Sequence, residues 1–400
     1  MKLRHKLLLF LLCLSQGMMA QLTSLGLVEE SNIENRKNEI RRGFYFIPEI
    51  KFVGENMLYA GTPTGLYKCD ISSLDAVKWE KLPITDDIIE DFEVRGDTVI
   101  VLSRKELLLS VDGGVTAQRR YSDTVFLGDI NYAQRELCNV AVFPDDAKRF
   151  YVAHQTNYLS YTDDFGESWA RIEGTGLTDL FYSPQNSNRL VGYRFTKSIT
   201  SAGAYISNDG GLNWMYARDE TQEHTDMYRM AFHPTDSNRL ALCGNGSYAL
   251  SFDGGESWKG IYRQVGIWSY SVAENIDVMY DTRNPSILYG AQLYSDFFRE
   301  NVDTMKVIRS IDGGLTWSEF FAAPMANKGN LLRMDIKDNI LVLYTSANGI
   351  YLLDVDAVDT SISTIENETS AAPYYDLQGR PVANPTRGIY IKDGKKIAVD

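Results

Sequence analysis

Three carboxylates recur at one position of a repeated pattern in this chain of 400 residues. Glu136, Asp226 and Glu274 each lie near the start of a short apolar run, at the same offset from the turn that follows it. Carboxylates that a fold brings together can bind a cation or act as the acid and base of glycoside hydrolysis. The alternative is that they are solvated carboxylates in loops. Which of the two applies depends on the strands and loops that carry them.

Other candidate binding residues lie in the connections between the apolar runs. Exposed aromatic rings stack on sugars or anchor protein partners, and the guanidinium group of arginine pairs with carboxylates. On these grounds the further candidates are Trp268, Tyr270, Arg194, His154, His224 and Arg299. Trp268 is the foremost of them, because the repeat described below accounts for the other five tryptophans. Arg229 is a further source of positive charge, but the sequence does not show that these arginines converge.

The sequence lacks the patterns of several catalytic classes. No pair of histidine and cysteine residues has the spacing of zinc ligands, so we expect neither a metal nor a cofactor. The Gly-x-Ser-x-Gly phrase of serine hydrolases is missing, and so is a phosphate-binding loop. No catalytic residue is therefore assigned, and whether the chain is an enzyme stays open at this point.

An eight-residue segment, called the box below, occurs five times and shows which elements position these groups. Its copies are SVDGGVTA (110–117), TDDFGESW (162–169), SNDGGLNW (207–214), SFDGGESW (251–258) and SIDGGLTW (310–317). The third position is always aspartate: Asp112, Asp164, Asp209, Asp253 and Asp312. These aspartates are 52, 45, 44 and 59 residues apart, which is close to the length of one four-stranded propeller blade.

The chemistry of the box is that of a turn. Its aspartate can accept hydrogen bonds from backbone N–H groups two or three residues on, and its fifth residue, glycine, adopts backbone angles that other residues resist. Serine or threonine at the first and seventh positions can cross-link the loop. The last position holds a tryptophan that can pack as an anchor: Trp169, Trp214, Trp258 and Trp317. We interpret the boxes as scaffold, because one aspartate per repeat would be spread around a ring instead of converging on one site.

Each repeat is predicted to contain four strands, a to d, in this order: strand a, a turn, strand b, a loop, strand c, the box and strand d. The sequence therefore predicts an all-β fold, a seven-bladed β-propeller with a short C-terminal β tail. Five blades carry a box, one precedes the first box with Trp79 in the place of the box tryptophan, and one follows the last box. Six or eight blades are the alternatives, since the widest gap between boxes has room for an insertion.

The repeated phrase resembles the Asp-box, or bacterial neuraminidase repeat, of sialidases, sortilin-type receptors, some xyloglucan-degrading enzymes and photosystem assembly factors. The resemblance covers roughly residues 44–356 and implies that a ligand site lies on the face of the d–a and b–c loops, where the candidates above are placed. Sialidases of this kind carry an arginine in an Arg-Ile-Pro phrase before the first box, but Phe46 stands there in this chain. We therefore favour a non-catalytic glycan- or protein-binding module over an exo-acting, sialidase-like glycoside hydrolase or an assembly factor.

The two ends of the chain indicate export. Residues 1–20 have the positive start and short apolar run of a secretory signal peptide, with cleavage expected after Ala20. A lipid anchor on Cys13 is the disfavoured alternative, because Leu12 stands where a small residue is expected. Residues 21–43 form a lead-in, 44–356 the propeller, 357–371 a Ser/Thr-rich linker and 372–400 a β tail.

The tail resembles the sorting tails of secreted Bacteroidetes proteins in its YDLQGRPV, RGIYI and GKK phrases. This resemblance implies a type IX secretion route with outer-membrane machinery as a partner, and a terminal β-extension is the alternative. We predict strands at 374–377, 388–392 and 396–399, with a hairpin turn at Asp393-Gly394.

Charge and cysteines narrow the choice of partners. The net charge is −13, and it becomes −16 (−13 − 3) once the three basic residues of the leader are removed. An acidic surface repels phosphate backbones, so we expect no nucleic-acid partner. The wide spacing of Cys69, Cys138 and Cys243 predicts buried core residues and no disulfide framework, and we expect a monomer on the cell surface or outside the cell.

Overall fold

The computed structural model describes residues 22–27, 49–74, 77–103, 106–122, 137–154, 158–194, 203–219, 227–244, 247–263, 271–296, 304–327, 331–346, 348–358, 374–375, 381–382, 388–392 and 395–399. At the ends of several strands only the backbone is described.

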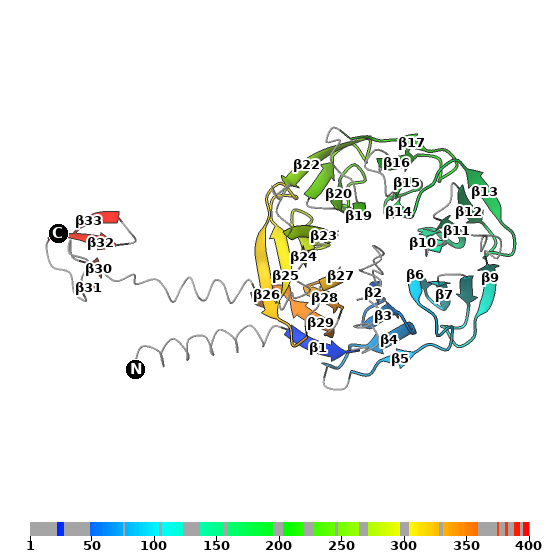
Figure 1. The fold of residues 1–400 in the computed structure, drawn as a ribbon, viewed down its shortest axis with the longest axis horizontal. Helices are drawn as coiled ribbons and strands as arrows, with labels where there is room; N and C mark the ends of the chain where they lie inside the picture. Colours follow the sequence, from blue (N-terminus) through cyan, green and yellow to red (C-terminus); the bar gives the residue numbers. More distant parts are fainter. Residues whose placement is uncertain are drawn as a thin grey trace. The chain divides into compact units, whose positions relative to one another are not determined.

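Seven sheets are arranged as a ring around a central axis (Figure 1). The innermost strands are β2 (Ile50–Val53), β6 (Ile89–Arg95), β10 (Leu137–Phe143), β14 (Asp179–Ser183), β19 (Met227–Phe232), β23 (Ser271–Tyr280) and β27 (Leu331–Lys337). We number blades 1–7 by these strands in chain order. The second strands are β3 (Met57–Thr62), β7 (Thr98–Ser103), β11 (Asp146–His154), β15 (Asn186–Arg194), β20 (Leu240–Gly244), β24 (Leu288–Asp296) and β28 (Ile340–Thr345).

The outer half of each blade is built in the same order. The third strands are β4 (Gly65–Asp70), β8 (Glu106–Ser110), β12 (Tyr158–Thr162), β16 (Gly203–Ser207), β21 (Ser247–Ser251), β25 (Thr304–Ser310) and β29 (Gly349–Asp354). The outermost strands are β5 (Glu80–Lys81), β9 (Gln118–Ser122), β13 (Ala170–Glu173), β17 (Met215–Tyr216), β22 (Ser257–Arg263), β26 (Ser318–Pro324) and, in blade 7, β1 (Leu22–Gly26). The predicted all-β, seven-bladed β-propeller is confirmed.

Blade 7 takes its outermost strand from the other end of the chain. β1 pairs antiparallel with β29, with Leu22 opposite Leu353 and Thr23 opposite Leu352. Leu25 is buried with Ile50 and other residues of blades 7 and 1. The lead-in assigned to residues 21–43 therefore contains a strand that the sequence analysis did not foresee.

Blades 4 and 5 are joined along their outer edges. After the short β17, Arg218–Asp219 form β18, which pairs in parallel with β22 of blade 5. Apolar side chains fill the spaces between neighbouring blades, for example where Ile100 and Leu107 of blade 2 meet Val140 and Phe150 of blade 3. This burial of apolar surface is the main source of stability in such a ring.

Every box connects the third strand of its blade to the fourth. In each of them the first residue donates its hydroxyl to the aspartate Oδ1 at 2.7–2.9 Å and accepts from the N–H of the fifth-position glycine at 2.7–2.9 Å. The seventh residue donates its N–H to the same Oδ1 at 2.8–2.9 Å. The aspartate thus reaches four residues on, because two residues between them turn the chain back with positive φ. The sequence analysis expected two or three residues, and Asp209 Oδ1 also accepts from the N–H of Leu212, three residues on, at 3.1 Å.

The boxes and the a–b turns lie on one face of the ring. The N–H of the fourth box residue donates to a carbonyl in the a–b turn of its own blade, or at the start of strand b in blades 3 and 4, at 2.8–3.1 Å. We call this the box face. Since neighbouring strands are antiparallel, the d–a and b–c connections lie on the opposite face, which we call the loop face.

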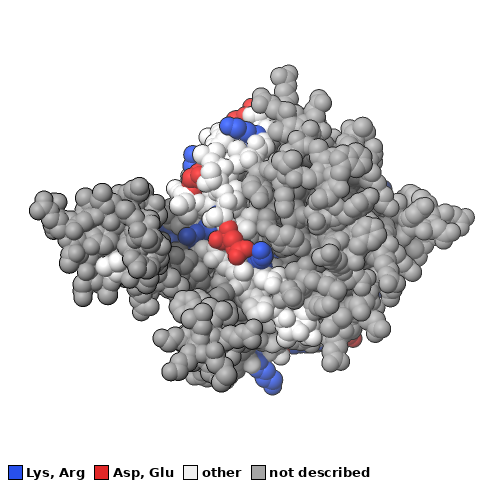
Figure 2. All heavy atoms as spheres, turned by 60° about the vertical axis from the view of Figure 1, so that its left-hand side comes forward, with Lys and Arg blue, Asp and Glu red and all other residues white. Residues whose placement is uncertain are grey.

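The surface of the described part mixes both signs of charge. Figure 2 shows acidic and basic residues next to each other on the side of the molecule that is turned forward, among mostly uncharged ones. An example of such a pair is Lys306 and Glu319 of blade 6, whose charged atoms are 2.8 Å apart. Cys69 and Cys243 are buried and form no disulfide, while the side chain of Cys138 is not described.

The tail after Asp354 belongs to a second compact unit. Its strands β30 (Tyr374–Tyr375), β31 (Pro381–Val382), β32 (Gly388–Lys392) and β33 (Lys395–Val399) form one sheet. Lys392 faces Lys395, which leaves two residues for the predicted hairpin turn. None of the helices in the described ranges is long and apolar enough to cross a membrane.

Candidate functional site

A bulge recurs on the inner strands of five blades. The pairing of each inner strand with its neighbour shifts immediately before one polar residue: Asp91, Asn139, Arg229, Asp277 and Arg333. Such a bulge bends the strand and redirects a side chain. Glu49 and Asp179 take the corresponding positions in blades 1 and 4, so a ring of seven polar residues follows the axis. We call these seven residues the axial ring.

Several members of the axial ring join one blade to the next. Asp91 Oδ2 accepts from the backbone N–H of Val140 at 3.0 Å, and Asn139 Oδ1 accepts from that of Leu180 at 3.0 Å. Asp277 Oδ2 accepts from Met334 N in the same way, at 2.8 Å. These buried side chains satisfy backbone donors of the neighbouring blade, so they have a structural task.

Two arginines of the axial ring converge on one glutamate. Oε1 of Glu49 accepts from Arg229 Nη1 at 2.9 Å and from Arg333 Nη2 at 2.8 Å. The same two guanidinium groups lie 3.8 and 3.9 Å from Asp277 Oδ1. Each arginine therefore has two carboxylate neighbours inside the protein.

Lys51, two residues beyond Glu49 on β2, is also paired. Lys51 Nζ lies 3.3 Å from Asp91 Oδ1 and 3.2 Å from Glu93 Oε2, and it donates to the carbonyl oxygen of Phe92. Its side chain is 25% exposed, against 7% for Asp91. Among the described residues of this cluster, no cation is left without a carboxylate.

The pKa shifts separate Glu49 from the aspartates. Burial alone would raise the pKa of Glu49, but Arg229, Arg333 and Lys51 together outweigh it, and the pKa is lowered. For Asp277 burial prevails over the two arginines and the pKa is raised. Burial likewise raises the pKa of Asp91 despite Lys51. Glu49 is thus held firmly ionised between the arginines.

One oxygen of Glu49 stays without a partner. Oε2 is buried and accepts no hydrogen bond within the described part of the chain. The side chain is 6% exposed. An ionised oxygen in such a place is costly unless a donor reaches it.

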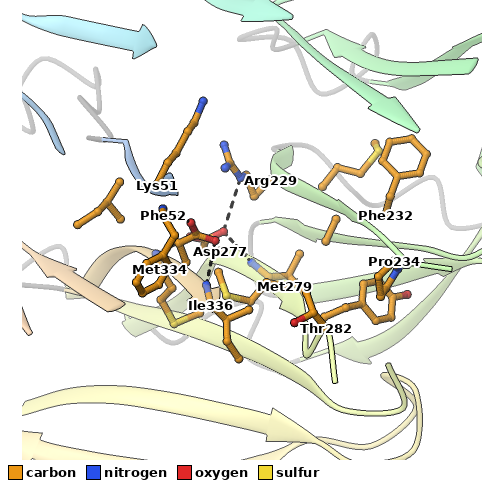
Figure 3. Close-up of a pocket in the computed structure, with 16 residues that line it drawn as sticks. Lys51, Phe52, Arg229, Phe232, Pro234, Asp277, Met279, Thr282, Met334 and Ile336 are labelled. Atoms are coloured by element: carbon orange, nitrogen blue, oxygen red, sulfur yellow. Dashed lines mark hydrogen bonds and ion pairs between the residues drawn. The ribbon is translucent and has the colours of Figure 1, made fainter. Parts of the chain in front are cut away.

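A cavity of about 390 Å³ extends along the axis on the box-face side of the arginines. It is lined from four inner strands and two a–b turns, with Lys51, Arg229, Asp277 and Asp335 as its charged residues and Phe52, Phe232, Met279 and Ile336 among its apolar ones. Figure 3 shows Asp277 between Arg229 and the backbone of β27, with the ammonium group of Lys51 pointing away from it. Pockets of this size hold small ligands or single side chains of a partner.

Comparisons with known proteins agree with the ring. No family model matches the chain. It is 27% identical over 157 residues to a protein named anhydrosialidase from Macrobdella decora, a match of 32% of this chain and 20% of that protein. The matched part thus spans only a fifth of the relative's length.

Solved structures resemble the chain over a larger share. A GH74 xyloglucanase from Xanthomonas campestris has a TM-score of 0.61 and 17% identity, covering 84% of this chain and 54% of the enzyme. YCF48 bound to D1 peptide has a TM-score of 0.55 and 16% identity, over 77% of this chain and 91% of that one. YCF48 from Cyanidioschyzon merolae has a TM-score of 0.52 and 12% identity, over 77% and 95%. These likenesses show a β-propeller.

Most of the candidate residues from the sequence lie outside the described residues. Glu136, Asp226, Trp268, Tyr270, His224 and Arg299 belong to this group. For Arg194, His154 and Glu274 only the backbone is described, on β15, β11 and β23. The three carboxylates singled out first are therefore neither brought together nor separated by the described structure.

The axial ring itself was not singled out, although a signal for it exists. Each inner strand has a polar residue at one fixed place in an otherwise apolar run, as in NVAVF (139–143) and DVMY (277–280). The sequence analysis aligned these strands by their turns but looked three residues too early, at Glu136 and Glu274. Arg229 was noted as a positive charge, and its convergence with Arg333 on Glu49 is new.

Proposed function

We propose that the chain is an exported, non-catalytic β-propeller that binds a glycan or a protein partner through its loop face. The observation that carries this proposal is the occupation of Arg229 and Arg333 by Glu49 Oε1, at 2.9 and 2.8 Å. A sialidase recognises its substrate's carboxylate through arginines, whose fork matches a carboxylate. Here both arginines already have an internal carboxylate as their partner. It comes three residues after Phe46, which stands where sialidases carry a further arginine.

The axial carboxylates support the same conclusion. An acid and base pair in a glycoside hydrolase must face the substrate on both sides of the scissile bond. Asp91 and Asp277 instead accept from backbone N–H groups of the next blade at 3.0 and 2.8 Å. Their oxygens are committed to holding blades together.

A sialidase-like glycoside hydrolase is the second candidate. It is favoured by the partial match to the protein named anhydrosialidase and by the convergence of two arginines at the axis. In that case the carboxylates at Glu136, Asp226 and Glu274 would supply the chemistry. The binding of YCF48 to a D1 peptide offers a precedent for the first candidate, a propeller of this shape that holds a polypeptide.

The proposed cellular location and the proposed binding face are inferred from the sequence. We propose cleavage after Ala20, surface or extracellular location, and sorting of the β tail by a type IX machinery of the outer membrane. The boxes, which we assign to the Asp-box type, serve as turns in this proposal. The loop face is the binding face because Trp268 and Tyr270 lie in one of its d–a connections.

Two measurements on the purified chain test the proposal. Fluorogenic α-sialosides and a panel of other aryl glycosides are incubated with the protein, and we expect no turnover above a blank. A glycan array and immobilised cell-surface proteins are then probed with wild type and Trp268→Ala, and we expect weaker binding of the variant. Turnover that disappears in Arg333→Lys would establish the hydrolase instead, whereas binding that is unaffected by Trp268→Ala would remove the loop face as the site.

A further inference from the structure

The axial cavity is reached from the box face, and its charged residues lie away from the a–b turns at its mouth. Pro234 and the exposed Thr282, both in a–b turns, line one end, and Lys51 and Arg229 line the other. In Figure 3 the two turn residues lie well apart from the ammonium group of Lys51. The cavity is therefore distinct from the loop face, where the proposed glycan or protein site lies.

The wall of the cavity combines apolar side chains with two carboxylates. Phe232, Met279 and Ile336 come from three inner strands and face the cavity between its mouth and its inner end. Asp277 and Asp335 lie on the neighbouring strands β23 and β27 and line the same space. Such a wall suits a ligand that has an apolar stem and a positive end.

The charges around the inner end do not cancel. The connected groups are the cations Lys51, Arg95, Arg229 and Arg333 and the carboxylates Glu49, Asp91, Glu93, Asp277 and Asp335. Four positive and five negative charges leave −1 (4 − 5) inside a low-dielectric ring, where a field is screened less than in water. An added cation lowers the energy of this cluster and an added anion raises it.

Asp335 is the carboxylate that a ligand would find least engaged. Among the described residues, its oxygens accept only from the backbone N–H groups of Phe52 at 2.7 Å and Ile336 at 2.9 Å. Within the described ranges no lysine or arginine lies within ion-pair distance of it. Burial raises the pKa of Asp335 to about 6 even though those two bonds and Arg229 lower it, so this carboxylate is ionised at neutral pH at a cost that a cation would relieve.

We propose that the axial cavity is a second binding site, which receives a lysine side chain of a partner polypeptide from the box face. The methylene stem packs along Phe232 and Met279, and the ammonium group lies against Asp335 and Asp277. The rings of Phe52 and Phe232 add cation–π attraction where they face the ammonium group. A polypeptide is the source because only a side chain held on a backbone can keep contact with the box face while its end reaches the carboxylates.

The overall charge of the chain favours such a partner. With a net charge of −13 the whole chain attracts basic proteins over distances of about a Debye length, roughly 8 Å at physiological salt. Lysine suits the cavity better than arginine, because its compact ammonium group sits on a flexible stem while guanidinium needs a planar, bidentate acceptor. Both oxygens of Asp277 and of Asp335 already accept from backbone N–H groups, so neither carboxylate can bind a guanidinium group with two parallel hydrogen bonds.

The test uses short acetylated and amidated peptides of glycine and serine with one central residue, measured by calorimetry against the full-length chain. We expect the lysine peptide to bind at least about tenfold more tightly than its norleucine and glutamate counterparts, and more tightly than free n-butylammonium. Raising the salt concentration should weaken the binding of the lysine peptide and leave the binding of the norleucine peptide unchanged.

Three variants locate the site. Asp335→Asn removes the least engaged carboxylate, and Thr282→Lys places a cation at the mouth on an exposed residue whose change leaves folding intact. Each of these two changes should lower the affinity for the lysine peptide by about tenfold or more. Asp145→Asn removes the same charge from an exposed a–b turn of blade 3 and should change binding less than about twofold, as should Trp268→Ala on the loop face.

Four results would overturn the proposal. They are equal binding of the lysine and norleucine peptides, preference for the glutamate peptide, full affinity for the lysine peptide in Thr282→Lys, and n-butylammonium binding as tight as the peptide, which would show a small amine as the ligand. Because Trp268→Ala tests the loop face separately, failure here leaves the proposed function untouched.

Discussion

The backbone N–H of Phe52 donates a hydrogen bond of 2.7 Å to Oδ2 of Asp335, 283 residues further along the chain. This bond joins blade 7 to blade 1 on the inner side of the ring. On the outer side β1 joins the same blade by pairing with β29. The ring is thus closed once by a carboxylate and once by a backbone ladder, and each closure can be altered separately.

The carboxylate closure should give the fold a pH dependence of its own. Asp335 has a pKa raised to about 6, above that of an unfolded chain, so the native state holds this proton more tightly. The stability gained in this way is complete below about pH 4 and is lost as the pH rises through about 6. We expect the loss of unfolding free energy in Asp335→Asn to be larger at about pH 4 than at about pH 7.5.

Urea unfolding of wild type and variant at both pH values measures this difference. The other charged groups that line the cavity beside Asp335 are Lys51, Arg229 and Asp277, and they are the same in both proteins, so their titration largely cancels. Asp145→Asn is the control, since an exposed aspartate should show no such trend. If Asp335→Asn loses the same unfolding free energy at both pH values, the pKa of Asp335 is not raised in the folded protein.

The outer closure should depend on a small buried contact. Leu25 of β1 is 5% exposed and packs in a cluster with Ile50, Leu58 and Ile350. Leu25→Ala should lower the unfolding free energy by about 2–4 kcal/mol, as other buried leucines do. Leu74→Ala changes the same side chain where it is 48% exposed, and should stay within about 0.5 kcal/mol of wild type. Equal effects of the two changes would mean that β1 contributes little.

The parts of the fold that could be predicted are those that repeat. Five boxes at blade spacing predicted the strands and turns of five blades, because each of these blades has the same local turn chemistry, while the count of seven needed two further blades without a box. β1 could not be found in this way, since its five residues carry no turn signal and it is defined only by a partner more than 300 residues away. The site was harder still, because Glu49, Arg229 and Arg333 come from three blades and only ring closure brings them together.

The arginine pair should become a binding site for small carboxylates once its internal partner is removed. Glu49→Ala leaves Arg229 and Arg333 without their shared acceptor, and breaking a buried pair costs about 3–5 kcal/mol. Acetate should restore part of that loss in the variant, because its carboxylate can take the place of the glutamate.

Melting temperatures in sodium acetate and in sodium chloride of equal ionic strength measure this effect. Wild type should respond equally to the two salts. If acetate stabilises Glu49→Ala no more than wild type, the two arginines do not form a carboxylate clamp, and the comparison with sialidases loses its physical basis.

A box aspartate should act on stability and not on binding. Asp253 Oδ1 accepts from Ser257 N at 2.9 Å and from Ser251 Oγ at 2.9 Å, so Asp253→Ala leaves donors unpaired. We expect a loss of about 1–3 kcal/mol. Asp163→Ala changes an exposed aspartate in the second position of another box and should have little effect. If Asp253→Ala melts like wild type yet abolishes an activity, the boxes take part in chemistry.

The tryptophans should divide into packing anchors and a binding aromatic. Trp258 is 3% exposed and belongs to a cluster with Val191, Ile206 and Leu242 between blades 4 and 5. Its Nε1 has no hydrogen-bond partner among the described residues, so packing alone explains its place. Trp258→Ala should therefore cost about 3–5 kcal/mol, while Trp258→Phe keeps a ring and should cost clearly less.

Trp169 provides a contrast within the same repeat. Its Nε1 donates to the carbonyl oxygens of Arg120 and Gly166, both at 3.1 Å, so Trp169→Phe loses hydrogen bonds that Trp258→Phe does not. We expect Trp169→Phe to forfeit about 0.5–1.5 kcal/mol for each lost bond in addition to the smaller ring. Trp268→Ala should melt like wild type and weaken only ligand binding, because we place Trp268 on the loop face. A Trp268→Ala variant that melts as low as Trp258→Ala would make Trp268 a core residue, and the loop face would then lose the aromatic on which its proposed function depends.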